Sequence, residues 1–482
     1  MSNRLRNAAL SLGAANAIDY ALQFLLPAIL TRFLDVSEFG GYRLFWLVTT
    51  TAITLTTWGM PQSLYFFIPR TEQARKRLYI YQAMLFLSVC GSIAALAILP
   101  GSPLLPKNAQ VLAELGGLPS AFVVLWGLST LLDLLPTADG RPQWQAKTIV
   151  GLSITRALLL GGTAMLSGSL VAVVWALMVF VMLKLSLLLF YMARYHGLRG
   201  PYVERTAFRV QTRYAIPFGI SGMLTSMRSQ AEQWVAAALF SIGQFADFSV
   251  ASVLSPLVTL FRHSMTQAFL TRMSELHAGG DATAMLDLNN RANVALALVL
   301  FPLLTFAFAF SDSLISLIYT ATYIRGGDVM RVYVVGMIAM SVEVNHVMML
   351  LQEGRFTTRI NLITLCISVA TSFACAKLFG VAGAAVGSVL AVYIERLSSL
   401  RRIGARLSLP LSALQNWSAL GRILLSAVMA TTVAWSMVAV VPANLPLVVR
   451  MGLTGGILTG AYLLMLWMLG MRTTLLALAR GR

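Results

Sequence analysis

The segment SMRSQAEQW, residues 226–234, carries two charged side chains inside an apolar run long enough to cross a bilayer. Arg228 and Glu232 lie four residues apart, so on a helix they share one face. The guanidinium of an arginine donates two parallel hydrogen bonds to a phosphate or a carboxylate, and these bonds are strong in a low-dielectric cavity. The spacing therefore predicts either a site for an anionic group or a charge pair that serves packing alone.

Four predicted helices carry polar side chains on one face by the 3.6-residue helical period. These faces are Asn16, Asp19, Gln23 and Pro27; Arg43, Trp46, Thr50, Thr54, Thr57 and Pro61; Ser221, Thr225, Arg228 and Glu232; and Ser252, Ser255, Thr259, Arg262, His263 and Thr266. A charge that faces lipid at mid-helix costs about 2.5–3.5 kcal/mol. We therefore expect the four faces to line one water-filled cavity.

The alternative is that these charges only pack against one another. Arg228 would then pair with Glu232 along one helix turn, and Arg262 with a carboxylate such as Asp19. His263 alone is more typical of a satisfied polar residue than of a proton relay.

Further polar groups inside apolar runs are open to more than one interpretation. Glu343, Asn345 and His346 fit either a coupling-ion site or an interhelical hydrogen-bond cluster. Arg156 and Lys184 lie nearer the ends of their helices, and we expect these long side chains to reach the membrane surface.

Composition requires that most of the chain lie in a membrane. Of the 482 residues 58% are hydrophobic and 11% are charged, and the mean hydropathy is +0.76, whereas a soluble domain carries roughly 25% charged residues. The sequence predicts an all-α polytopic membrane protein of about fourteen transmembrane helices. The predicted spans are 8–33, 44–68, 78–99, 119–136, 148–167, 170–192, 215–240, 248–270, 292–311, 329–351, 360–377, 381–397, 422–441 and 449–470.

Basic residues gather in alternate loops, which matters more than the net charge of +18. The rich loops hold Arg70, Arg75, Lys76 and Arg77; Arg194, Arg199, Arg205, Arg209 and Arg213; Arg396, Arg401, Arg402 and Arg406; and Arg472, Arg480 and Arg482. The positive-inside rule places these loops and both termini in the cytoplasm. Attraction to anionic membrane lipids explains the charge, and no nucleic-acid partner is expected.

The sequence carries no signature of catalysis, metal binding or a cofactor. Cys90, Cys366 and Cys375 fall inside predicted spans, the four histidines are scattered, and the common hydrolase and phosphate-binding motifs are absent. We therefore expect no enzyme, no metal and no cofactor.

Two short segments repeat weakly. RFLDVSEFGGYRLF at 32–45 is echoed by LFSIGQFADFSVAS at 239–252, and MPQSLYFFIPR is echoed by MTQAFLTRM. Six predicted helices separate the copies, so both halves have the same orientation, and such folds bind substrate between the halves. Within the second half, the Gly-rich FGVAGAAVGS at 379–388 predicts a tight turn into a helix with small packing residues.

The spans, the basic loops and the repeat together predict five regions. They are an N-terminal six-helix lobe at 1–192, a basic cytoplasmic linker at 193–214, a C-terminal six-helix lobe at 215–400, a basic cytoplasmic segment at 401–421, and two additional transmembrane helices with a short cytoplasmic tail at 422–482.

The segments LPAILTRFLDVSEFGGYRLFW and GMPQSLYFFIPR, together with LFGVAGAAVGSVLAVYIE at 378–395, resemble the polysaccharide-transporter proteins of the multidrug, oligosaccharidyl-lipid and polysaccharide (MOP) exporter superfamily, including O-antigen flippases of the Wzx type. The resemblance implies two parallel, pseudo-symmetric six-helix lobes around a central cavity. It also implies a flippase that moves undecaprenyl-pyrophosphate-linked oligosaccharide from the cytoplasmic to the periplasmic leaflet of the bacterial inner membrane by alternating access.

That resemblance assigns roles to the polar faces. Arg228, Arg262 and Arg43 would meet the pyrophosphate, while Asn16, Gln23 and Thr225 would complete the substrate cavity. Asp19 and Glu232 would offset the charge, and with Glu343 they are candidates for coupling to H⁺ or Na⁺. Trp46, Trp58 and Trp234 are candidates for stacking on a sugar. Other polysaccharide-assembly proteins are expected partners.

Two rival functions remain open from the sequence. A cation-coupled drug exporter of the same superfamily would need an acidic cavity, whereas arginines match or exceed carboxylates on the predicted faces. A membrane glycan polymerase or ligase would need a large periplasmic loop, and the longest such loop, 100–118, holds only Lys107 and Glu114 as charges.

A topology test follows from the alternation of basic loops. A C-terminal fusion to green fluorescent protein should be bright and one to alkaline phosphatase inactive, because the C-terminus is predicted to be cytoplasmic. Alkaline phosphatase inserted after Leu445, in the base-poor loop 442–450, should be active. The reverse pattern would overturn the orientation.

Overall fold

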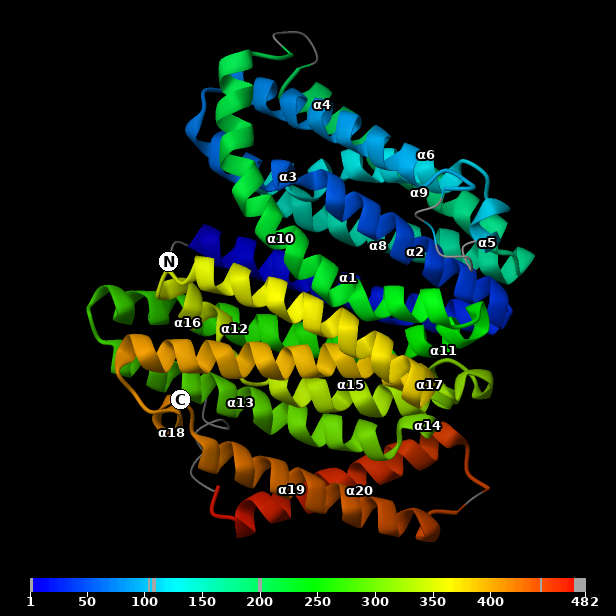
Figure 1. Cartoon of the computed structure of the whole chain (residues 1–482), viewed down its shortest axis with the longest axis vertical. Coiled ribbons are helices and arrows are strands. Elements are labelled where there is room, and N and C mark those ends of the chain that lie inside the picture. The colour runs from blue at the N-terminus through cyan, green and yellow to red at the C-terminus, as the bar shows by residue number, and fades with distance from the viewer. Residues whose placement is uncertain (1–2, 103–104, 106–109, 198–201, 443, 472–482) are drawn as a thin grey trace. The chain divides into compact units, whose positions relative to one another are not determined.

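The computed structural model describes residues 3–102, 105, 110–197, 202–442 and 444–471. Within these residues the regular structure is helical and contains no strand (Figure 1). Ten of the described helices are long and apolar enough to cross a membrane. The predicted all-α membrane fold is confirmed. The chain divides into two compact units, Met1–Ala246 and Asp247–Arg482.

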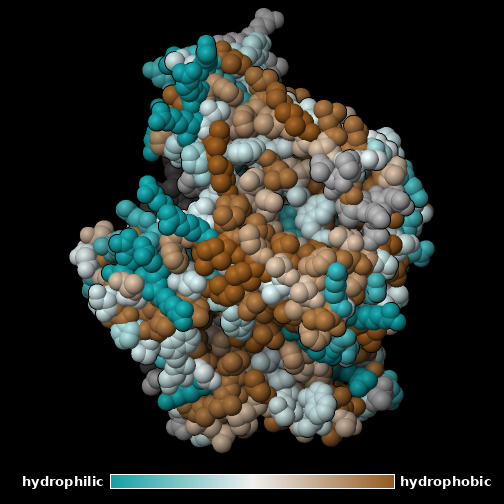
Figure 2. All heavy atoms as spheres, viewed as in Figure 1, coloured by the Kyte–Doolittle hydropathy of each residue, from teal (hydrophilic) through white to brown (hydrophobic). Residues whose placement is uncertain are grey.

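Large apolar side chains are exposed along the outer faces of these helices, as the brown areas in Figure 2 show. Leu166 is 89% exposed and Leu378 75% exposed. A soluble protein rarely tolerates apolar surface on this scale. The surface is that of a protein whose solvent is lipid.

The described part of unit 1 is built from helices. They are α1 (Asn3–Phe33), α2 (Val36–Thr57), α3 (Met60–Phe67), η1 (Ile68–Arg70), α4 (Gln73–Ala97), α5 (Gln110–Ala113), α6 (Leu118–Ser129), η3 (Thr130–Asp133), α7 (Leu135–Ala138), α8 (Pro142–Ser167), α9 (Leu170–Tyr195) and α10 (Arg205–Leu239), while α11 (Ile242–Val250) crosses the unit boundary. Proline lies in the first turn of α3, α6, α7 and α8, where its missing N–H costs no helical hydrogen bond.

Packing within unit 1 brings α1 along the length of α8, and places α6 between α4 and α9. Gly168 ends α8 in the left-handed conformation, with φ 58°, so that α9 can begin two residues later beside α8. Helix α10 packs against α2 and α3. The sequence-based lobe bounds at 192 and 215 stay a prediction.

A buried ion cluster ties together the ends of α4, α7 and α9. Asp139 accepts a hydrogen bond from the Tyr191 hydroxyl at 2.8 Å, lies 2.7 Å from His196 Nε2, and lies 3.7 Å from Lys76 Nζ. Burial alone would raise the pKa of Asp139, but His196, Tyr191 and Lys76 together hold it below its usual value. The cluster therefore stabilises the folded state at neutral pH, and that contribution is lost as the pH falls through the lowered pKa.

Unit 2 starts at Asp247 within α11, and its first complete element is η4 (Ala251–Leu254). Its other elements are α12 (Ser255–Ala278), α13 (Ala282–Ala309), α14 (Ser311–Ile318), η5 (Ala321–Tyr323), α15 (Gly326–Met340), α16 (Asn345–Leu350), α17 (Gly354–Leu407), α18 (Leu411–Leu414), α19 (Trp417–Ser436), η6 (Met437–Val440) and α20 (Leu447–Met468). Asp281 caps α13 and Asn416 caps α19 by accepting a hydrogen bond from a first-turn N–H.

The long segment α17 contains two of the predicted spans. Gly380 interrupts it with φ 67° and ψ −147°, a conformation open to glycine, and the chain folds back on itself there (Figure 1). A Cβ added at Gly383 would lie 2.0 Å from the Cys375 carbonyl oxygen, and one at Gly387 would lie 2.3 Å from Ser372 Oγ. The predicted tight turn with small packing residues is confirmed.

Several predicted spans are interrupted in the structure, among them 44–68, which breaks at residues 58–59 between α2 and α3, and 119–136, which is broken by η3. The predicted span 329–351 is broken at residues 341–344 between α15 and α16, and 248–270 is broken by η4. Hydropathy does not detect such breaks, because the apolar run continues across them. The tail beyond residue 471 lies outside the described residues.

The close contact of the α17 hairpin gives a stability test. Gly387→Val should lower the yield of folded protein and its melting temperature, at a cost of about 1–3 kcal/mol, because the added side chain meets Ser372 and the Ser368 carbonyl. Gly460→Val on α20 is the matched control, since nothing lies within 4 Å of a Cβ there. Equal thermal unfolding of the two variants would contradict the packing.

Candidate functional site

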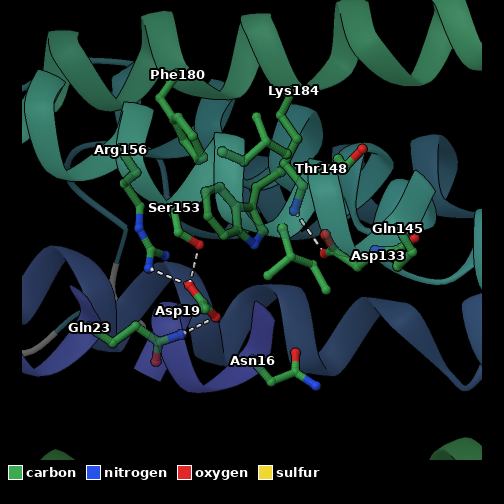
Figure 3. Close-up of a pocket in the computed structure, with 13 residues that line it drawn as sticks. Asn16, Asp19, Gln23, Asp133, Gln145, Thr148, Ser153, Arg156, Phe180 and Lys184 are labelled. Atoms are coloured by element: carbon green, nitrogen blue, oxygen red, sulfur yellow. Dashed lines mark hydrogen bonds and ion pairs between the residues drawn. The ribbon is translucent and has the colours of Figure 1, made fainter. Parts of the chain in front are cut away.

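A cavity of about 340 Å³ lies inside unit 1 between α1, α6, η3, α8 and α9. Its lining is mixed, with aromatic, amide, hydroxyl and charged side chains facing the same space (Figure 3). The polar lining residues are Asn16, Asp19, Gln23, Asp133, Gln145, Thr148, Ser153, Arg156 and Lys184. A polar space inside membrane-spanning helices is a candidate site by default.

Asp19 is the centre of the hydrogen-bond network on one wall. Its Oδ1 accepts from Ser153 Oγ at 2.6 Å and lies 3.4 Å from Arg156 Nη2, while its Oδ2 accepts from Gln23 Nε2 at 2.7 Å. Ser153 and Arg156 stand one turn apart on α8, and Asp19 and Gln23 one turn apart on α1. The predicted polar face Asn16, Asp19 and Gln23 thus lines one cavity with α8.

Lys184 and Asp133 form the second charge pair. Lys184 Nζ lies 2.7 Å from Asp133 Oδ2 and 4.9 Å from the centre of the Trp126 ring, and Lys184 is 5% exposed. The expectation that Arg156 and Lys184 reach the membrane surface is wrong. Both turn inward because a carboxylate lies beside each of them, and pairing there avoids the cost of an isolated charge.

Helix α10 places its polar residues in different surroundings. Glu232 is buried, Arg228 is half-buried and Thr225 is exposed. On another side of α10, Thr51 of α2 donates to Gln230, and Trp234 Nε1 donates to Thr51 Oγ1 at 2.9 Å. That side packs on α2, and Arg43 of α2 is half-buried. The cavity between the two halves stays a prediction, and the His263 side chain lies outside the described residues.

Unit 2 holds a cluster of charges around one carboxylate. Glu343 pairs with Arg262 of α12 and lies 3.6 Å from Arg396 Nη1 of α17 and 3.8 Å from His346 Nδ1. The backbone N–H of Asn345 donates to Glu343 Oε1 at 2.9 Å. Arg262 therefore pairs with a carboxylate of its own unit, Glu343, whereas Asp19, the example given from the sequence, bonds to α8. Glu343 forms an interhelical cluster, one of its two sequence-based interpretations.

Two asparagines one turn apart on α13 hold the broken backbone at Glu343. Asn289 and Asn293 donate to its carbonyl oxygen at 3.2 and 3.4 Å, and its N–H donates to Asn293 Oδ1 at 3.1 Å. These bonds satisfy backbone groups that the helix break leaves without helical partners. The i, i+4 spacing of two amides at the start of the predicted span 292–311 was the available sequence signal for them.

Several cavity residues were not singled out from the sequence. Trp126 and Phe180 supply its aromatic wall, with ring centres 6.1 Å apart, and Gln145 and Thr148 supply polar groups from α8. Gln145 is 2% exposed, and its Oε1 has no hydrogen-bond partner within the described chain. Among the described residues no group of three His, Cys, Asp or Glu side chains is placed to hold a metal.

The Lys184–Asp133 pair in the cavity gives a test by substitution. Asp133→Asn should lower the free energy of unfolding by about 1–3 kcal/mol, because it removes the counter-charge of Lys184 while Asp133 itself is half-exposed. Combining it with Lys184→Met should recover most of the loss. Asp287→Asn, in an exposed pair on α13, is the control and should change little. Thermal unfolding in detergent measures all three; equal effects of Asp133→Asn and Asp287→Asn would contradict the assignment.

Comparison with known proteins identifies solved structures that share this architecture. No curated protein sequence matches the chain. The lipid II flippase MurJ in an inward closed conformation superposes with a TM-score of 0.73 at 11% identity, over 98% of this chain and 99% of that one. An inward-facing multidrug resistance MATE family transporter of the MOP superfamily superposes with a TM-score of 0.60 at 14% identity, over 81% of this chain and 96% of that one. The Vibrio cholerae MATE transporter VcmN superposes with a TM-score of 0.54 at 12% identity, over 85% of this chain and 97% of that one.

These similarities establish the fold. A family model described as polysaccharide biosynthesis protein matches residues 5–277, which include nearly all of α1, all of α2 to α11, the cavity and nearly all of α12. The chain therefore belongs to the family of polysaccharide biosynthesis proteins.

Proposed function

We propose that this protein is a flippase that moves undecaprenyl-pyrophosphate-linked oligosaccharide from the cytoplasmic to the periplasmic leaflet by alternating access. The glycan would serve O-antigen, capsule or exopolysaccharide synthesis. The observation that carries the proposal is a polysaccharide biosynthesis family match on a chain that shares its fold with a lipid II flippase over 98% of its length. A membrane-embedded protein of this family is suited to the step in which the lipid-linked glycan crosses the bilayer.

Arginine side chains would bind the anionic head group of the substrate. A pyrophosphate needs strong donors, and Arg228, Arg262 and Arg43 are the candidates in the halves of the chain that alternating access would move. Arg262 is held by Glu343 in this structure. Glu343 would therefore act as its resident counter-ion, to be replaced by the substrate phosphate.

The carboxylates are candidates for coupling transport to H⁺ or Na⁺. Asp19 lies in the cavity of unit 1, bonded to Arg156, and Glu232 is buried on α10 one turn from Arg228. A drug exporter is less well supported, because both cavity carboxylates already face a cationic side chain. The proposed location of the protein is the bacterial inner membrane, with both termini in the cytoplasm. Membrane lipids would surround the helices, and other polysaccharide-assembly proteins would be partners.

Deletion of the gene tests the proposed function directly. Lipid-linked oligosaccharide should accumulate in the cytoplasmic leaflet, where it is protected from a glycan-modifying enzyme added outside spheroplasts, and surface polysaccharide should fall. Expression of the wild-type protein should restore both. Unchanged delivery of the lipid-linked oligosaccharide to the outer leaflet in the deletion strain would refute a flippase role.

Substitution of Arg228 tests the anion site. Arg228→Ala should reduce surface polysaccharide at least tenfold while the protein still inserts, and Arg228→Lys should keep part of the activity because the charge remains without the planar fork. Arg291→Ala, which removes an exposed cation on α13, is the control. The packing alternative predicts instead that Arg228→Ala lowers the protein level. In that case adding Glu232→Ala would recover both level and activity.

A further inference from the structure

We propose that the cavity of unit 1 binds one neutral, hydroxyl-rich sugar unit of the transported glycan, with Trp126 and Phe180 as its aromatic wall and Gln145 and Thr148 as its polar contacts. This inference rests on the proposed function and names the part of the substrate that the cavity recognises. The pyrophosphate is assigned to the arginines outside this cavity.

The balance of charge in the cavity selects a neutral ligand. The described lining contains two carboxylates, Asp19 and Asp133, and two cations, Arg156 and Lys184. Each carboxylate faces its own cation, at 3.4 Å for Asp19 and 2.7 Å for Asp133. A pyrophosphate would need surplus positive charge, and a cationic drug would need surplus negative charge. Neither surplus exists among these side chains.

Polar groups in the wall match a ligand rich in hydroxyl groups. Gln145 Oε1 is a buried acceptor without a donor in the described chain, and leaving such an atom unsatisfied costs about 1–3 kcal/mol. Thr148 lies one turn further along α8 on the same side of the cavity. A sugar hydroxyl both donates and accepts, so one hydroxyl can bond to Gln145 and another to Thr148.

The aromatic side chains are fixed before any ligand arrives. Trp126 packs against Phe122 and Trp46, with ring centres 5.1 and 5.4 Å apart, and its ring is also 6.1 Å from Phe180. The C–H groups on the face of a pyranose ring pack on such aromatic surfaces, while the ring hydroxyls point outward to polar partners. An aromatic wall whose rings are already packed on one another loses little conformational entropy on binding.

The size of the cavity limits the ligand to a small part of the glycan. At about 340 Å³ it lies at the lower end of the roughly 300–1,000 Å³ that small-molecule pockets span. One sugar unit fits this range, whereas an oligosaccharide would have to extend beyond the cavity. The cavity would therefore bind one sugar unit of the glycan.

The test measures binding of free sugars to the full-length protein in lipid nanodiscs by saturation-transfer NMR. The probes are glucose, galactose, rhamnose and N-acetylglucosamine, with glucuronate, inorganic pyrophosphate and tetraphenylphosphonium as charged comparisons. At least one neutral sugar should bind the wild type, and the charged probes should not displace it. Thr148→Val and Gln145→Leu, which keep side-chain volume, should each weaken that binding about fivefold to tenfold, the effect of one lost hydrogen bond.

A matched control lies on the same helix. Thr155 is half-buried on α8, donates to the Gly151 carbonyl of its own helix at 2.8 Å and does not line the cavity, so Thr155→Val should bind sugar like the wild type. Melting temperatures should confirm that all three variants fold. The proposal is overturned if no neutral sugar binds, if Thr148→Val and Gln145→Leu bind as well as Thr155→Val, or if a charged probe displaces the sugar.

The outcome separates this inference from the proposed function. If the deletion strain accumulates lipid-linked oligosaccharide but no sugar binds the purified protein, the sugar site fails and the flippase stands. If sugar binds in the predicted manner but the deletion strain delivers its lipid-linked oligosaccharide normally, the flippase role fails while the sugar site remains.

Discussion

Charge neutralisation inside an apolar bundle is the constraint on which the rest of this structure depends. Lipid offers a buried charge no solvation, so each ionised side chain needs an opposite charge or a hydrogen-bonding group at the same depth. Asp19 binds α1 to α8, Lys184 binds α9 to the turn at Asp133, and Glu343 binds α12 to α17. Each pair links helices that are distant in sequence, and together these links fix how the helices of each unit pack around their polar interiors.

Sequence patterns predicted much of the fold because the membrane restricts it to helices. Hydropathy, glycine placement and helical period are local properties of the chain. They predicted the spans, the turn at Gly380 and the polar face of Asn16, Asp19 and Gln23. The broken segment at 341–344 was missed because Asn289 and Asn293, some fifty residues earlier, supply the hydrogen bonds that permit it.

The partners of the charged residues could not be predicted for a related reason. A helical period shows that Asp19 faces a polar environment, but not that α8 will supply Ser153 and Arg156. The position of Lys184 nearer the end of its helix suggested that its side chain reaches the membrane surface, whereas the outcome depended on Asp133 at the end of η3. Trp126 and Gln145 gave no signal at all, because an isolated aromatic or amide in a span is common.

The pairing of charges in the cavity of unit 1 has a consequence for how membrane voltage acts on the protein. Moving one elementary charge through the full potential is worth about 2.3 kcal/mol per 100 mV. Arg156 pairs with Asp19 and Lys184 with Asp133, so a rearrangement that carries both members of each pair across the membrane moves no net charge. The electric field does almost no work on this cavity, and any voltage dependence of transport has to come from the substrate, from a coupling ion, or from charged side chains outside the cavity.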